Sequence, residues 1–310
     1  MATLFIADLH LDPSRPQITA LFENYLASDE VRHADALYIL GDLVEAWIGD
    51  DDDAELPQRI ATAIRAVRDA GVPVYFMVGN RDFLLGETFA QRAGLTLLDD
   101  GTVHELYGRP TLLMHGDVLC TDDVAYQTVR QQVRTPQWKA QILSMPLEAR
   151  RAFATKARED SRAHTGATQE SIMDVNDAAM KRAMHDADVT RLIHGHTHRP
   201  AVHSLQLDDQ DAERIVLGDW YEHGSVLKVT PDGVELLGLS AALFSSQASR
   251  ILPAANLVST SGYGVDTLPN FLLSPRSSLS IAGMQAPAAL SHAFGRLAAQ
   301  KSGGLDTDLS

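Results

Sequence analysis

The chain is short of cysteine and of long apolar stretches. Cys120 is its only cysteine in 310 residues, so no internal disulfide can form, and a reducing cytosol is the expected compartment. No apolar run approaches the roughly 18 residues that a membrane-spanning helix needs. No secretory leader is expected ahead of the first run, at residues 4–7. Any membrane role is therefore expected to be peripheral.

Positive charge is also scarce. Lysine and arginine number 26 against 41 aspartate and glutamate residues, which gives a formal net charge of −15. Because a phosphate backbone would be repelled, this balance argues against broad nucleic-acid binding. With 45% hydrophobic and 22% charged residues, the composition is typical of a soluble globular protein with one large domain or two smaller ones.

Five polar clusters each directly follow a short apolar run. The runs lie at residues 4–7, 37–40, 74–78, 111–114 and 190–193. Such runs predict buried strands, and ligand-binding groups gather outside the strand ends of sheets of this kind. We therefore expect the clusters to meet at one rim of a sheet. They are Asp8-Leu9-His10, Gly41-Asp42, Gly79-Asn80-Arg81-Asp82, His115-Gly116-Asp117 and His194-Gly195-His196-Thr197-His198.

The clusters hold the donors of a two-metal centre. Asp42 has two carboxylate oxygens and can bridge two ions, which a neutral ligand does poorly. Carboxylates, imidazoles and one carboxamide suit Mn²⁺, Fe²⁺ or Zn²⁺, and a set without cysteine argues against a structural zinc site. Two ions roughly 3.5–4 Å apart would activate a bridging hydroxide and neutralise charge on a phosphoryl group. The expected ligands are Asp8, His10, Asp42, Asn80, His115, His196 and His198.

Each cluster taken alone also has a structural explanation. An aspartate at a strand end, such as Asp8 or Asp42, is often only a turn or helix cap. Three histidines within five residues are harder to explain in this way, although His194 itself is expected to be a core residue. The order of all five clusters, each after a predicted strand, favours the metal centre.

The remaining pattern predicts an α/β fold. Helical spacing at residues 16–27 and 57–70 alternates with the predicted strands. After His198, four shorter strands at residues 201–207, 214–217, 226–230 and 234–239 predict a second, mostly antiparallel sheet packed on the first.

Residues 121–188 differ from both parts, because they are helix-patterned and lie between two of the clusters. Segments 124–133, 136–143, 146–157 and 172–187 are each long enough for a helix, and such an insertion predicts a cap over a site. Between residues 121 and 162 there are eight basic and five acidic residues, which suits an anionic ligand. A solvated helix face of mixed charge explains this equally well. Residues 1–240 are expected to form the main domain and residues 241–310 a mostly disordered extension.

The order of the clusters resembles the calcineurin-like metallophosphoesterase superfamily, whose pattern is D-x-H, G-D, G-N-[HR]-[DE], H and G-H-x-H. The resemblance covers residues 3–239 and implies a two-sheet β-sandwich flanked by helices. It also implies two ligand sets, which are Asp8, His10, Asp42 and His198 for one ion, and Asp42, Asn80, His115 and His196 for the other.

Arg81 stands where many members of that superfamily carry a histidine that protonates an alkoxide leaving group. Arginine, with a pKa above about 12, cannot usefully release its proton, but it can clamp phosphate oxygens and stabilise transition-state charge. A leaving group that needs no proton, such as a phosphate, therefore fits better, and pyrophosphate cleavage is favoured over alkyl monoester hydrolysis. Two alternatives remain: Arg81 pairs with Asp82, or another histidine supplies the proton. Asp42 and Arg81 are the expected catalytic residues.

Longer motifs are similar to those of the UDP-2,3-diacylglucosamine pyrophosphohydrolases of bacterial lipid A synthesis. This resemblance implies Mn²⁺, hydrolysis at the nucleotide α-phosphorus, and release of UMP and a diacylglucosamine 1-phosphate. It further implies a cap over the acyl chains and a peripheral place on the cytoplasmic face of the inner membrane. The motifs include Glu45-Ala46-Trp47-Ile48-Gly49-Asp50, Gly79-Asn80-Arg81-Asp82-Phe83-Leu84, Cys120-Thr121-Asp122-Asp123 and Ile172-Met173-Asp174-Val175-Asn176.

The implied contacts to the lipid substrate fall on both the main domain and the cap. At Thr165 and Thr168 the family has an asparagine and a lysine, so one basic contact is missing, and Arg162 or His164 could replace it. A related enzyme for a soluble nucleotide, and a metal-binding scaffold without turnover, are the competing hypotheses; only a lipid enzyme should need the acyl chains. The implied contacts are Asn80, Arg81, Asp123, Ser161, Thr165, Thr168 and His196.

Overall fold

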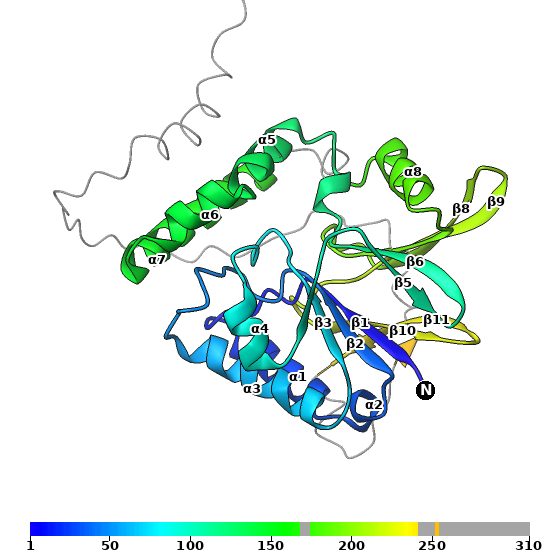
Figure 1. Ribbon diagram of the computed structural model, residues 1–310, viewed down its shortest axis with the longest axis horizontal. Coiled ribbons are helices and arrows are strands. Elements are labelled where there is room, and N and C mark those ends of the chain that lie inside the picture. Colours follow the sequence, from blue (N-terminus) through cyan, green and yellow to red (C-terminus); the bar gives the residue numbers. More distant parts are fainter. Residues whose placement is uncertain (168–173, 241–251, 254–310) are drawn as a thin grey trace, which may run out of the picture. The chain divides into compact units, whose positions relative to one another are not determined.

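Two β-sheets pack face to face in the computed structural model, which describes residues 1–167, 174–240 and 252–253, without the side chains of residues 162–167 (Figure 1). Phe5, Tyr38 and Met77 from one sheet meet Leu113 and Ile193 from the other in a shared apolar core. This arrangement agrees with the predicted α/β sandwich flanked by helices. The expectation of disorder after residue 240 falls on residues outside this description, apart from residues 252–253.

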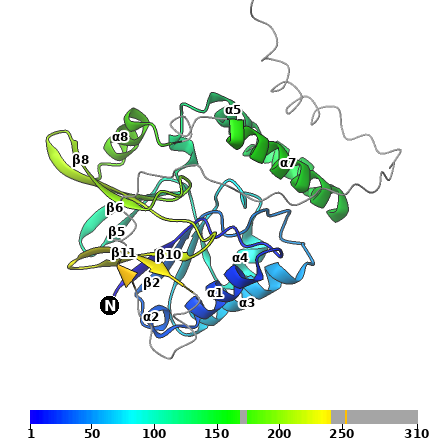
Figure 2. The ribbon, with the colours of Figure 1, turned by 180° about the vertical axis from the view of Figure 1, so that it is seen from behind.

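The seven-stranded sheet carries the first three polar clusters. In its parallel part, the strands lie side by side in the same order as in the sequence, and they include strands that the apolar runs predicted. Helices cover the outer face of this sheet (Figures 1 and 2). Isoleucine and leucine side chains from two of these helices, at Ile18, Leu21 and Ile64, enter the core beneath the sheet. In sheet order the strands are β12 (Leu252–Pro253), β11 (Gly233–Leu239), β10 (Gly224–Thr230), β1 (Thr3–Ile6), β2 (Ala36–Leu40), β3 (Val74–Met77) and β4 (Thr96–Leu98). The helices are α1 (Pro16–Leu26), α2 (Asp29–Arg32), α3 (Glu55–Asp69) and α4 (Glu87–Ala93).

The five-stranded sheet carries the other two clusters. Helix α8 (Asp177–Asp186) packs on its outer face, where Met180 and Met184 contact Leu112 and Leu192. In sheet order its strands are β5 (Thr102–Leu106), β6 (Arg109–Met114), β7 (Arg191–His194), β9 (Gln210–Val216) and β8 (Ala201–Leu207).

The prediction that the four strands after His198 form a sheet of their own is wrong. Strands β8 and β9 extend the five-stranded sheet, since β9 pairs in parallel with β7, whereas β10 pairs antiparallel with β1 in the other sheet. The hairpin turns were located correctly: Asp208 and Asp209 both have positive φ, as a two-residue turn between antiparallel strands requires. The apolar pattern locates each strand but does not identify the strand with which it pairs. Pairing with β10 covers an edge of β1 that would be unpaired without it.

A group of helices lies apart from the sheets and is here called the cap (Figure 1). The cap consists of α5 (Val124–Val133), α6 (Pro136–Leu143) and α7 (Leu147–Ala167), and a short 3₁₀ helix (Asp117–Leu119) leads into it. Helices α5 and α6 match their predicted bounds, while α7 continues ten residues beyond the expected end at residue 157. Among the described residues, no helix is both long enough and apolar enough to span a membrane.

Candidate metal centre

The seven expected ligands lie just beyond the ends of five strands. Asp8 and His10 follow β1, Asp42 follows β2 and Asn80 follows β3, so the seven-stranded sheet supplies four of them. The five-stranded sheet supplies the other three, as His115 follows β6 while His196 and His198 follow β7. His194, the expected core residue, is fully buried as the last residue of β7.

Asp8, His10 and His198 gather at one point beside Asp42. The Nε2 atoms of His10 and His198 are 3.2 Å apart, and His198 Nε2 is 3.4 Å from Asp8 Oδ1. The same Nε2 atom of His10 is 3.8 Å from Asp42 Oδ2. These donors are close enough to share one cation.

A second set gathers on the other side of Asp42. Asn80 Oδ1 is 3.0 Å from His115 Nε2 and 3.0 Å from His196 Nδ1. His115 Nε2 is also 3.7 Å from Asp42 Oδ1. Asp42 thus turns one carboxylate oxygen to each set, which is the arrangement expected of a carboxylate that bridges two cations.

The chemistry of these donors fits cations. The imidazole nitrogens of His10 and His198 face each other across 3.2 Å. The amide oxygen of Asn80 faces two further imidazole nitrogens. Asp8 Oδ1 is buried and accepts no hydrogen bond within the described part of the chain, although His198 Nε2 lies 3.4 Å away. A buried carboxylate oxygen without a donor is costly unless a positive charge compensates it. The donor set therefore fits two divalent ions.

The backbone at these positions adopts a conformation that side chains rarely take. Of nine non-glycine residues with positive φ in the described ranges, five are expected ligands, with φ of 55° at Asp8, 47° at His10, 52° at Asp42, 68° at His196 and 56° at His198. Such residues cost of order 1–3 kcal/mol each and cluster at functional sites. Backbone hydrogen bonds from Asp8 N to Gly41 O (3.0 Å) and from His10 N to Asp42 O (2.9 Å) hold the first two loops together.

Glycine is required beside two of the ligands. A Cβ on Gly79 would lie 2.2 Å from Asp42 Oδ1, and one on Gly195 would lie 2.4 Å from Asp8 Oδ2. The close approach of loops from different strands therefore explains the glycine in both motifs.

The buried charges influence one another strongly. Burial lowers the pKa of His115, but the carboxylates of Asp42 and Asp117 outweigh it and raise that pKa to about 9. Burial and the nearby His115 lower the pKa of His196 to about 4. For Asp8, burial raises the pKa, yet His198 outweighs it and holds the pKa well below its ordinary value. An ionised carboxylate and a neutral imidazole are the forms that donate electron pairs to a metal, so Asp8 and His196 already have the donating form, whereas His115 would release a proton when a cation binds.

Asp82 ties two of the site loops together. Its buried carboxylate accepts hydrogen bonds from the backbone amides of Leu43 (2.7 Å) and Gly79 (2.7 Å). Burial and the charge of Asp42 raise the pKa of Asp82 to about 7. Its oxygens therefore serve the loops rather than Arg81, whose buried Nε has no hydrogen-bond partner among the described residues. The backbone amide of Arg81 donates to Asp42 Oδ1 at 2.8 Å.

The expected substrate contacts are spread over the cap and its approach. Asp123 is buried and caps α5, where it accepts a hydrogen bond from the amide of Tyr126 (2.9 Å). Ser161 is half-buried on α7. Thr165 lies on α7, but its side chain falls outside the description, as does Thr168 entirely.

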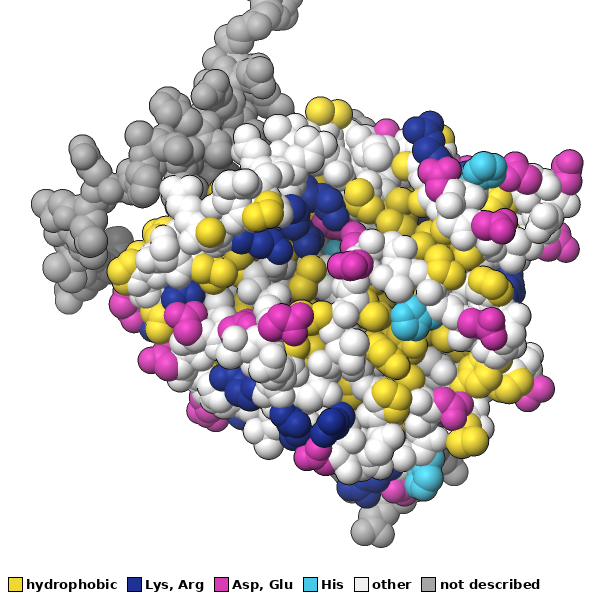
Figure 3. All heavy atoms as spheres, in the orientation of Figure 1, with side chains coloured by type: hydrophobic (Ala, Val, Ile, Leu, Met, Phe, Trp, Pro, Cys, Tyr) yellow, Lys and Arg dark blue, Asp and Glu magenta, His cyan; other side chains and the backbone are white. Residues whose placement is uncertain are grey.

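Positive charge gathers where the cap meets the centre. Lysine and arginine side chains form a group below α5 in the space-filling view (Figure 3). Arg130 Nε donates to Asp117 Oδ2 (2.8 Å), and Arg134 Nη2 donates to the carbonyl oxygen of Gly79 (2.9 Å). Since Gly79 precedes Asn80, this positive charge lies beside the second set, where an anionic substrate would approach.

Sequence reasoning assigned no role to three residues that contact the expected ligand histidines. Glu45 Oε2 lies 3.1 Å from His10 Nδ1, and Asp219 Oδ2 lies 3.5 Å from His198 Nδ1. The ring of Tyr221 stacks on that of His10, with centroids 5.2 Å apart and planes at 9°. Glu45 lies in a motif that the resemblance pointed to, whereas Asp219 and Tyr221 follow a strand with no comparable signal.

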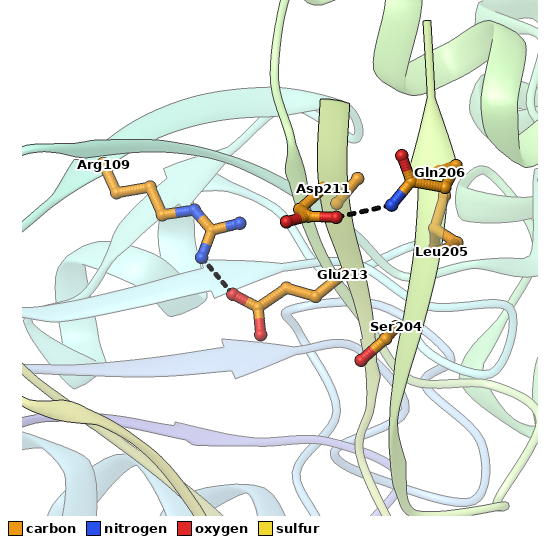
Figure 4. Close-up of a pocket in the computed structure, with 7 residues that line it drawn as sticks. Arg109, Ser204, Leu205, Gln206, Asp211 and Glu213 are labelled. Carbon is orange, nitrogen blue, oxygen red and sulfur yellow. Dashed lines mark hydrogen bonds and ion pairs between the residues drawn. The ribbon is translucent and has the colours of Figure 1, made fainter. Parts of the chain in front are cut away.

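A surface hollow of about 520 Å³ lies away from this centre, between β6 and the β8–β9 hairpin (Figure 4). Its charged side chains are already paired: Arg109 with Glu213, and Asp211 with Gln206. None of the expected site residues lines it. The hollow therefore offers no chemistry that competes with the centre at the strand ends.

Known proteins resemble the chain at this centre and well beyond it. The family model described as calcineurin-like phosphoesterase matches residues 1–200. A UDP-2,3-diacylglucosamine hydrolase of Xanthomonas oryzae pv. oryzae is 57% identical over 243 residues, covering 76% of this chain and 98% of the relative. Proteins of the same name from Stenotrophomonas maltophilia and Cellvibrio japonicus are 56% identical over 247 residues (77% and 99% covered) and 54% identical over 236 residues (76% and 98% covered).

Proposed function

Because the chain belongs to the calcineurin-like phosphoesterases, and within them to the UDP-2,3-diacylglucosamine hydrolases, we propose that it hydrolyses UDP-2,3-diacylglucosamine in lipid A synthesis. The reaction adds water across the pyrophosphate bond at the α-phosphorus. UMP and 2,3-diacylglucosamine 1-phosphate are the products. The agreement of three relatives in name, each covered almost to its full length, supports this substrate.

The observation that carries the proposal is the placement of Asp42 between two sets of donors. When bound, two divalent cations supply an activated water and neutralise charge on the phosphoryl group. Asp8, His10, Asp42 and His198 would hold one of them, and Asp42, Asn80, His115 and His196 the other. We take Mn²⁺ as the working metal, because mixed oxygen and nitrogen donors suit it.

Arg81 is the residue that we assign to the phosphate oxygens. Its backbone amide donates a hydrogen bond to Asp42, so the Arg81 side chain extends from the rim of the centre. A guanidinium can hold two phosphate oxygens at once and stabilise the charge that develops on them. The departing sugar phosphate carries its own negative charge and needs no proton, so a residue that cannot act as an acid is sufficient there.

Membrane association completes the proposal. The substrate is a lipid, and the described residues contain no spanning helix, so we propose a peripheral place on the inner membrane at its cytoplasmic face. The cap would cover the acyl chains. Its exposed apolar side chains include Val124, at 70% exposure, and Leu143, at 42%.

The full-length chain with Mn²⁺ is expected to release UMP from UDP-2,3-diacylglucosamine and to stop when EDTA is added. Mn²⁺ in excess should restore the rate. Deacylated UDP-glucosamine should be a poorer substrate by at least about 10²-fold in kcat/KM, because each buried CH₂ supplies about 0.8 kcal/mol. Equal turnover of both substrates would instead identify a soluble nucleotide as the substrate. Binding of two ions without any hydrolysis would identify a scaffold.

Replacing Arg81 with alanine is expected to lower kcat by about 10²–10³-fold, the usual effect of removing one donor to transition-state charge. Arg81→Lys should recover part of this loss, since lysine keeps the charge but not the two-pronged geometry. The measurement is the rate of UMP release at saturating Mn²⁺. Arg68→Ala is the control, because Arg68 lies exposed on α3 and pairs with Asp69. An unchanged kcat in Arg81→Ala would remove Arg81 from the mechanism.

A further inference from the structure

The outer nitrogen of His10 faces a carboxylate. While His10 Nε2 points to the first donor set, its Nδ1 lies 3.1 Å from Glu45 Oε2. Both side chains are nearly inaccessible, with exposed fractions of 2% and 11%. A histidine that ligates a metal through one nitrogen usually donates the other N–H to a carboxylate or carbonyl, which fixes its tautomer and ring orientation.

The second oxygen of Glu45 faces the cap. Glu45 Oε1 lies 3.3 Å from Nε of Arg158 on α7, and Arg158 Nη2 lies 3.4 Å from Asp12 Oδ2. Asp12 follows His10 by two residues, so Arg158 contacts the loops after both β1 and β2. Glu45 therefore lies between an expected ligand histidine and a cap arginine, with one carboxylate oxygen turned to each.

The opposite part of α7 is attached differently. Arg150 and Arg151 form ion pairs with Asp51, Asp52 and Asp53, which lie on the loop after β2. These pairs fix the start of α7 but do not contact His10 or Glu45. Arg151 and Arg158 lie two turns apart on α7. Because Arg158 contacts Glu45 while Arg151 contacts the loop after β2, substitutions at these two residues separate attachment of the cap from its contact with the metal site.

We propose that Glu45 is a positioning residue that sets the orientation of His10, and that Arg158 couples this orientation to the position of α7. The inference rests on the proposed function, because it takes His10 as a metal ligand. Displacement of α7 would withdraw the guanidinium from Glu45 and loosen His10, while a seated cap would hold both. The cap then affects metal binding at the first donor set, in addition to covering the acyl chains of the substrate.

Mn²⁺ affinity of the full-length chain, measured by electron paramagnetic resonance of the free ion, tests the coupling without any turnover. Glu45→Ala is expected to weaken one of the two Mn²⁺ sites by about 10–100-fold and to leave the other unchanged. Glu45→Gln should lose less, since its amide keeps an acceptor oxygen facing Nδ1 of His10. Arg158→Gln should weaken the same site by about fivefold, the scale of one partly exposed ion pair.

The double variant and a matched control decide between coupling and general loosening. In the Glu45→Gln background, Arg158→Gln should have no further effect on affinity, because the two residues act through one contact. Arg151→Gln, on the same helix, should leave both affinities unchanged. Additive losses, or a loss in Arg151→Gln equal to that in Arg158→Gln, would overturn the proposal.

Failure of this inference is distinct from failure of the proposed function. If the unmodified chain binds two Mn²⁺ and hydrolyses the lipid substrate, yet Glu45→Ala binds both ions as tightly, the coupling alone is wrong. If the unmodified chain binds fewer than two ions, the metal centre itself is wrong, and the coupling falls with it.

Discussion

Replacing Asp42 with alanine is expected to abolish measurable turnover, with a fall in kcat/KM of about 10³-fold or more. Asp42 is the expected ligand that the two donor sets share, with Oδ2 turned to His10 and Oδ1 turned to His115. Its loss leaves each set short of an anionic oxygen and removes the acceptor for the amide of Arg81. Both the charge and the spacing of the centre therefore change at once.

The measurement is UMP release together with Mn²⁺ stoichiometry in the same preparation. Asp42→Asn should keep the shape but supply only one good donor oxygen, so it should lose nearly as much activity as the alanine variant. Asp232→Ala, in the exposed turn between β10 and β11, is the control for loss of a negative charge far from the centre. An Asp42→Ala variant that binds two ions and keeps a tenth of the activity would contradict the shared-ligand arrangement.

Replacing Trp220 with alanine is expected to reduce the free energy of unfolding by about 3–5 kcal/mol. Trp220 is fully buried, and its ring meets Phe22 and Tyr25 of α1 edge to face at centroid distances of 6.4 and 6.0 Å. Its indole N–H donates to the carbonyl oxygen of Ser225 (3.0 Å). The substitution would leave a large cavity and an unpaired carbonyl beneath the seven-stranded sheet.

The same variant should also disturb the centre, because Trp220 anchors the loop that contacts two of the expected ligand histidines. Its backbone amide donates to the carbonyl oxygen of Asp8 (3.0 Å), and its neighbours Asp219 and Tyr221 contact His198 and His10. Denaturant-induced unfolding of the full chain gives the stability. Trp220→Phe, which keeps a ring but loses the donor, should cost less. A loss below about 1 kcal/mol in Trp220→Ala would show that the core collapses around the gap.

The parts of the fold that follow from local pattern could be predicted. Apolar runs of four or five residues that are followed by glycine, aspartate or histidine located β1, β2, β3, β6 and β7 to within two residues at each end. The expected ligands come together for the same reason, since donors that follow neighbouring strands meet at the strand ends. Helices α5 and α6 have the predicted bounds, and the structure shows that Asp123 and Thr135 cap their first turns.

The sequence could not indicate which strands pair when they lie far apart in the chain. Nothing in residues 224–230 indicates that they lie beside β1 rather than beside β9, because both edges accept an apolar strand. Glu45, Asp219 and Tyr221 were missed for a related reason: each acts through a residue from another strand end. The additional turns of α7 were missed because the sequence there is mostly polar or alanine and carries little apolar periodicity.

The division of the ligands between two sheets has a consequence for the life of the chain before it is fully folded. Four of the groups belong to one layer and three to the other, so neither layer alone can assemble the catalytic apparatus. A nascent or partly unfolded molecule, even one with a complete seven-stranded sheet, would be inert towards pyrophosphates. Hydrolysis of a pyrophosphate would thus report that the two layers have docked.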